Sequence, residues 1–73
     1  MKTYVTIIFS SEGAKPSDVK ERLLELGLKA LKGNYDFVYE WNEEPDIDNL
    51  LYLADKIHTA LKGTEVLFSL ETV

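Results

Sequence analysis

The chain has no cysteine, one histidine and only two prolines among its 73 residues. Without cysteine it can form neither a disulfide nor a thiolate zinc site. One histidine cannot build a multi-histidine site within a single chain, so we predict no metal site and no cofactor. A domain this short buries only roughly 60% of the surface that its unfolded chain exposes. Oligomerisation is the remaining common source of stability, and we expect a homodimer.

Positive charge is also scarce, since 13 acidic side chains face 8 basic ones and the formal net charge is -5. Negative charge repels phosphate groups, which disfavours nucleic acids and anionic membranes as partners. The apolar run at residues 4–9 is too short to span a membrane, and no small-residue cleavage site follows it. The absence of cysteine fits a reducing compartment. We therefore expect a cytoplasmic protein with neither a nucleic-acid nor a membrane partner.

The order of apolar and polar residues predicts strands and helices within one domain, residues 1–73. Residues 4–9 are rich in β-branched and aromatic side chains and predict a strand. Pro16 and Asp18 predict the start of a helix with Ser17 as its N-cap, and Asp46 predicts the N-cap of a second helix. Residues 65–73 predict a last strand. The stripe that we expect the second helix to bury consists of Ile47, Leu50, Leu51, Ala54, Ile57 and Leu61, with Leu53 widening it.

Residues 35–41 alternate strictly, with four aromatic side chains on one face of a predicted strand. Rings at these positions would suit base stacking, but that function needs basic neighbours, and this strand supplies acids instead. We therefore predict that the aromatic face packs under the helices. The expected core is Phe37 and Phe68 together with Ile7, Leu23, Leu26, Leu50, Ala54, Ile57 and Leu61. The expected aromatic row is Tyr35, Phe37, Tyr39 and Trp41.

Two element orders are open, and they differ in where the first helix ends. If Gly27 ends it near Leu26, residues 28–31 form a strand that turns at residues 32–34 into the next strand. The order is then βαββαβ, a ferredoxin-like α+β sandwich with two helices on one face of an antiparallel sheet. If the helix continues to Lys32, the order is βαβαβ, an α/β fold with three strands.

The segment Gly33-Asn34-Tyr35-Asp36 resembles the Gly-x-Tyr-Asp hairpin of two related groups. These are the effector-binding domain of the leucine-responsive transcription regulators and the small stand-alone family named after its Gly-Tyr-Asp motif. Gly27-Leu28-Lys29 and residues 56–61 resemble the thiamine-binding-type family of small proteins. Both resemblances imply a ferredoxin-like fold and side-by-side association through sheets, which favours βαββαβ. They imply no common ligand and no catalytic residue.

If the aromatic row faces the helices, alternation assigns the residues of the opposite face. Its apolar centre, and our predicted dimer interface, is Tyr4, Ile8, Val38 and Leu67. Acidic residues, among them Asp36 and Glu40, form its rim and could hold a cationic ligand. His58 lies at the edge of the second helix's stripe. We take Asp36, Glu40 and His58 as candidate ligand-binding residues.

These features favour a stand-alone binding or regulatory module that associates through its sheet and binds a small metabolite at the subunit boundary. No catalytic residue is predicted, because no nucleophile–base spacing or phosphate-binding loop is present. One alternative is a small enzyme of the dimeric α/β barrel type, with His58, Asp36 or Glu40 as its acid or base. Another is a purely structural interaction protein.

Overall fold

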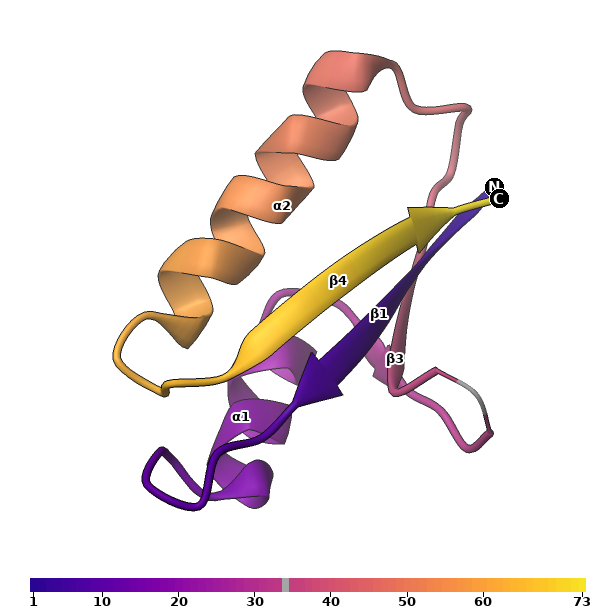
Figure 1. Cartoon of the computed structure of the whole chain (residues 1–73). Helices are drawn as coiled ribbons and strands as arrows, with labels where there is room; N and C mark the ends of the chain where they lie inside the picture. The colour runs from indigo at the N-terminus through magenta and orange to yellow at the C-terminus, as the bar shows by residue number, and fades with distance from the viewer. Residues whose placement is uncertain (34) are drawn as a thin grey trace.

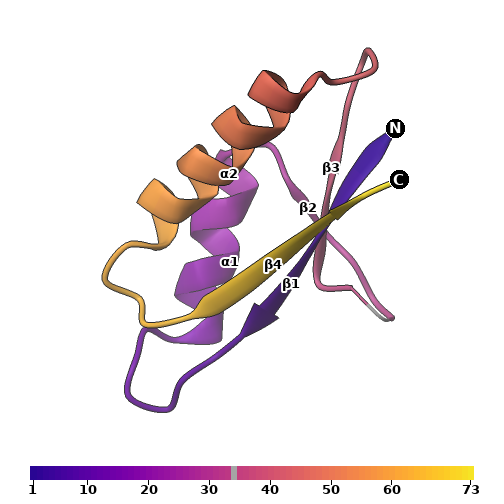
Figure 2. The same ribbon diagram turned by 45° about the horizontal axis from the view of Figure 1, so that its top comes forward.

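The computed structural model describes residues 1–33 and 35–73. Its elements in chain order are β1 (Lys2–Ile8), α1 (Pro16–Glu25), β2 (Lys29–Ala30), β3 (Phe37–Glu40), α2 (Ile47–Leu61) and β4 (Leu67–Thr72). Both helices lie on the same side of a twisted sheet, as Figures 1 and 2 show. The fold is therefore the α+β arrangement with the order βαββαβ, and the three-stranded alternative is wrong.

The sheet has the strand order β2-β3-β1-β4, and each neighbouring pair is antiparallel. β1 is central: Tyr4 lies opposite Val38 of β3, and Thr6 lies opposite Ser69 of β4. The two outer strands are unequal, because β2 has two residues and β4 has six.

Gly27 decides between the two element orders. It has φ +97°, a conformation that costs a glycine little, and it follows Leu26, the C-cap of α1. The N–H of Leu28 donates to the carbonyl of Leu23 (3.2 Å), and the N–H of Gly27 donates to that of Leu24 (3.0 Å). These two bonds form a Schellman motif, which ends the helix and releases the following residues to form β2.

The helix starts were predicted with mixed success. Asp46 is the N-cap of α2, as predicted, and it exchanges hydrogen bonds with Asn49 in a capping box. Ser17 is not the N-cap of α1, which is Lys15, without a side-chain cap bond. Pro16 already takes the first helical position, where its fixed φ is favourable, so the cap lies two residues earlier than predicted.

The hairpin between β2 and β3 is present, but its strands are shorter than the predicted ranges 28–31 and 35–41. The N–H of Leu31 donates to the carbonyl of Asp36 (2.9 Å), which closes the connection immediately beyond β2. The predicted turn residues were Lys32, Gly33 and Asn34, of which Asn34 lies outside the described residues.

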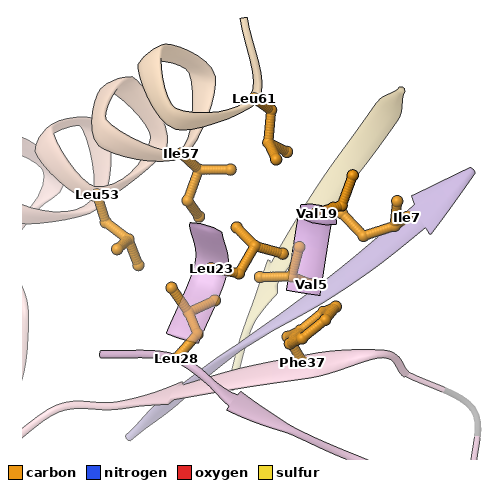
Figure 3. Packing of buried hydrophobic residues seen from close by; sticks show 9 residues of the cluster. All are labelled: Val5, Ile7, Val19, Leu23, Leu28, Phe37, Leu53, Ile57 and Leu61. Carbon is orange, nitrogen blue, oxygen red and sulfur yellow. The ribbon is translucent and has the colours of Figure 1, made fainter. Parts of the chain in front are cut away.

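The core fills the space between the sheet and the two helices (Figure 3). Its buried members are Val5, Ile7, Val19, Leu23, Leu28, Phe37, Leu53, Ile57 and Leu61, and the partly buried ones around it include Leu26, Tyr39, Trp41, Phe68 and Leu70. α2 contributes the i, i+4 row of Leu53, Ile57 and Leu61. Ile57, Leu61 and the widening residue Leu53 are buried, as predicted. The rest of the predicted stripe is not: Ile47 and Leu51 are exposed, and Leu50 and Ala54 are only half-buried.

Candidate functional site

The uncovered face of the sheet, opposite the helices, carries an exposed apolar pair. Ile8 of β1 and Leu67 of β4 lie directly opposite each other in the register. They are 62% and 68% exposed, respectively. A shallow hollow of about 90 Å³ is lined by Thr6, Ile8, Leu67, Phe68 and Ser69. Large apolar side chains adjoining in water are typical of an interaction surface.

Tyr35 lies on this uncovered face, whereas the aromatic alternation had placed it under the helices. Its ring stacks on that of Tyr4, with centroids 4.6 Å apart. Its hydroxyl donates a hydrogen bond to Oε2 of Glu71 (2.6 Å), so the side chain reaches from the β2–β3 connection to β4. Alternation fails here because β3 begins only at Phe37, two residues later. The hydrogen bond to Glu71 raises the pKa of Tyr35, with desolvation and the nearby carboxylate charge acting in the same direction.

Val38 is buried within the single chain, although it was predicted to lie in water at the interface. It is only 5% exposed, and its cross-strand neighbours are Tyr4 and Lys29. Side chains directly opposite in neighbouring strands stand on the same face of a sheet, so these two long side chains flank it. Of the four predicted interface residues, Ile8 and Leu67 are exposed and Tyr4 is half-buried.

The carboxylates of Asp36 and Glu40 each have a partner within the chain. Asp36 Oδ2 accepts a hydrogen bond from the backbone N–H of Ile7 (2.7 Å), so it extends the contact between β1 and the segment before β3. Glu40 forms an exposed ion pair with Lys29 (2.7 Å). The hydrogen bond and charge of this pair lower the pKa of Glu40 and raise that of Lys29.

His58 does not join these two carboxylates. It is an exposed residue of α2, on the helix layer, beside a hollow of about 300 Å³ whose other lining residues include Leu61, Val66 and Phe68. Asp36 precedes β3 and Glu40 ends it, so three residues of extended chain lie between them. The three candidate ligand-binding residues therefore form no common site in one chain.

A third hollow, of about 330 Å³, lies where β3 leads into α2. Its lining residues are Tyr39, Trp41, Asn42, Glu43, Glu44, Pro45 and Asn49. The two rings meet edge to face with centroids 4.8 Å apart. The indole Nε1 of Trp41 donates to Oγ1 of Thr3 (2.8 Å), which fixes the ring. The alternation of residues 35–41 assigned both rings to the core, so the sequence reading did not predict this hollow. Glu43 and Glu44, shortly after Trp41, were the sequence feature that could have indicated it.

Within residues 1–33 and 35–73, no three histidine or acidic side chains gather in a way that could hold a metal ion. In the same residues, no helix is long and apolar enough to cross a membrane. No protein-family model matches the chain, and neither a curated protein nor a solved structure matches it. The function is therefore inferred from the geometry described above.

Proposed function

We propose that the chain is a small binding module that self-associates through its sheet and binds a small metabolite. The observation that carries the proposal is the cross-strand pair of Ile8 and Leu67, exposed on the face that neither helix covers. Removing apolar surface from water contributes roughly 25 cal/mol per Å², against the cost of lost rigid-body freedom.

Internal bonds of the acidic groups near this face also support self-association. The chain is acidic overall, and copies that approach each other repel. However, Glu40 is paired with Lys29, and Glu71 accepts a hydrogen bond from Tyr35. The ion pair with Lys29 offsets the charge of Glu40, so a second copy meets less repulsion at this part of the face, whereas Glu71 keeps its negative charge.

Two glutamate substitutions at equally exposed apolar positions test self-association. Leu67 on the sheet and Ile47 at the start of α2 are 68% and 67% exposed, so neither change empties the core. We expect Leu67→Glu to weaken the association measured by sedimentation velocity and Ile47→Glu to leave it unchanged. Monomeric wild-type protein at high concentration, or a larger loss with Ile47→Glu, would contradict the proposal.

Local charge supports a cationic metabolite. Residues 33–55 contain no lysine or arginine. Their acidic residues are Asp36, Glu40, Glu43, Glu44, Asp46, Asp48 and Asp55. The hollow beside Trp41 combines two of these carboxylates with two aromatic rings, a combination that suits an organic cation.

Trp41 is the only tryptophan, so its fluorescence reports directly on this hollow. We expect small amines to change its emission and to raise the melting temperature by mass action. The double variant Glu43→Gln/Glu44→Gln should lose both effects, whereas Glu12→Gln, distant in sequence, should keep them. Equal responses in both variants would mean that the amines act as general counter-ions.

An enzyme of the dimeric barrel type has less support. It needs a free acid or base aimed into an enclosed space. Asp36 and Glu40 are held by Ile7 and Lys29, and His58 is exposed on α2. The binding module therefore remains our proposal.

A further inference from the structure

The free edge of β4 has its own hydrogen-bonding pattern. Lys2 and Val73 exchange both backbone hydrogen bonds, each 3.0 Å long, which identifies them as a hydrogen-bonded pair of the β1–β4 ladder. Antiparallel ladders alternate such pairs with non-hydrogen-bonded ones. Phe68, Leu70 and Thr72 consequently fall in the non-hydrogen-bonded positions. Their backbone N–H and C=O groups point away from β1, to the side where the described sheet has no further strand.

This edge lacks the usual protection against pairing. Natural edge strands are often very short or carry lysine, proline or a bulge. At the other end of the sheet, β2 has two residues and carries Lys29. β4 has the six-residue sequence LFSLET, without lysine, proline or glycine. In Figure 1, β4 runs along the outside of the sheet beside β1.

The side chains near the edge are apolar and incompletely covered. Phe68 and Leu70 face the helix layer but are only half-buried, and Leu67 on the other face is exposed. The hollow that Phe68 shares with His58 lies between the end of α2 and the start of β4. α2 therefore does not close over this part of the edge.

We propose that two copies of this chain pair β4 against β4 about a two-fold axis, which joins their sheets into one of eight strands. The proposal rests on the self-association proposed above and places the contact at the β4 edge. Leu67, on this edge strand, adjoins the second copy, whereas Ile8 on β1 stays on the uncovered face of the joined sheet. An antiparallel strand edge is complementary to itself under a two-fold axis. Because β2 offers only a two-residue edge, the assembly closes as a dimer and does not extend into a fibre.

Charge excludes two registers of this pairing, and we place the axis at Ser69. An axis at Glu71 places that residue opposite its own copy, and an axis at Phe68 places Glu71 opposite Glu65. Like charges directly opposite each other are destabilising. An axis at Ser69 instead places Glu71 opposite Leu67 and, on the helix side, Phe68 opposite Leu70. It also brings the outward N–H and C=O groups of Phe68 and Leu70 into reciprocal hydrogen bonds.

In the Ser69 register, Ser69 of one copy lies directly opposite Ser69 of the other copy. A non-hydrogen-bonded antiparallel pair has Cα atoms about 4.5 Å apart, which lies within the range of a disulfide. The chain has no cysteine, so Ser69→Cys supplies a single thiol per copy. Thr6→Cys is the matched control, because Thr6 lies opposite Ser69 on β1. In the proposed dimer the two Thr6 positions are separated by three strand spacings, roughly 14 Å, too far for a disulfide.

The experiment compares air oxidation of the two variants at low protein concentration, read by non-reducing electrophoresis and mass spectrometry. We expect Ser69→Cys to convert mostly to a disulfide-linked dimer and Thr6→Cys to stay mostly monomeric. Equal cross-linking, or more with Thr6→Cys, would overturn edge pairing in favour of face-to-face packing.

A charge substitution gives an independent readout. Ser69 is exposed, so Ser69→Lys should leave the thermal unfolding of the monomer unchanged. In the proposed dimer, however, the two lysines would lie opposite each other at the axis and repel. We expect a several-fold rise in the dissociation constant measured by sedimentation. A dimer that persists unchanged in Ser69→Lys refutes the edge geometry alone. A wild-type chain that is monomeric at every concentration refutes the proposed self-association as well.

Discussion

Replacing Phe37 by alanine tests the orientation of the sheet on which every site described above depends. The ring is buried in the core between the sheet and the helices (Figure 3). Truncating a buried phenylalanine costs about 3–5 kcal/mol, because apolar contact is lost and a cavity remains. At about 0.05–0.15 kcal/mol per residue, a chain of this length has a total free energy of unfolding of about 4–11 kcal/mol. Phe37→Ala should therefore remove a large part of the stability.

Urea unfolding followed by Trp41 fluorescence measures this loss. With a slope of about 1 kcal/mol per M of urea, the midpoint should fall by about 3 M or more, or the variant should be unfolded in buffer. Phe9→Ala is the matched control, since Phe9 is exposed and lies outside the core cluster. A surface substitution of this kind changes stability by about 0.5 kcal/mol or less. All variants are compared at one protein concentration, because self-association adds to apparent stability.

The result that would refute this reasoning is a midpoint of Phe37→Ala close to that of the wild type. Phe37 would then face solvent, and Asp36 and Val38 would face the helices. The uncovered face, the exposed pair and the register of the dimer would all have to be reassigned.

Three further predictions concern local features. Asp46→Ala should cost about 1 kcal/mol through loss of the capping box, whereas Ser17→Ala should be nearly neutral; far-ultraviolet circular dichroism melts compare them. Gly13→Ala should lower the melting temperature in the same assay, because a Cβ there overlaps a backbone carbonyl of the α2–β4 connection. The raised pKa of Tyr35 means that its bond to Glu71 stabilises the fold below the unfolded phenol pKa and is lost as pH rises through the folded one. Glu71→Gln should therefore lower the pH at which phenolate absorbance appears, and an unchanged titration would contradict the role of this bond.

The parts of the fold that the sequence predicted well are those set by local chemistry. Gly27 can adopt the positive φ that a Schellman motif needs, and this property follows from the residue type. Asp46 caps α2 with a carboxylate whose reach to the third residue of the helix is fixed by the chain. Such interactions span few residues, so a sequence window contains both partners. Gly27 nevertheless left both element orders open in the sequence, and the family resemblances favoured βαββαβ, the order that the structure has.

The errors occurred where an element's limit or rotation depends on a distant part of the chain. Alternation was extended from Phe37 back to Tyr35, but β3 begins only at Phe37, and the side chain of Asp36 bonds to the N–H of Ile7. Tyr35 consequently turns to the other face, where it meets Glu71, a residue remote in sequence. The predicted stripe of α2 contained the buried row but was too wide, because several apolar stripes fit the same helix and packing against α1 buries only the one through Ile57.

The candidate site shows the same division between local and long-range information. The composition of residues 67–72, with neither lysine nor proline, can be read directly from the sequence, yet the same composition would be ordinary in a central strand. Only the strand order places this segment at an edge, and only the reciprocal bonds of Lys2 and Val73 establish which backbone groups point outward. For the acidic residues, composition alone is misleading. Their number indicates repulsion between copies, but the position of Glu71 along β4 allows a register in which it faces Leu67. The apolar and acidic residues of this surface can be identified from the sequence, but only the strand order and register determine how a second copy can contact them.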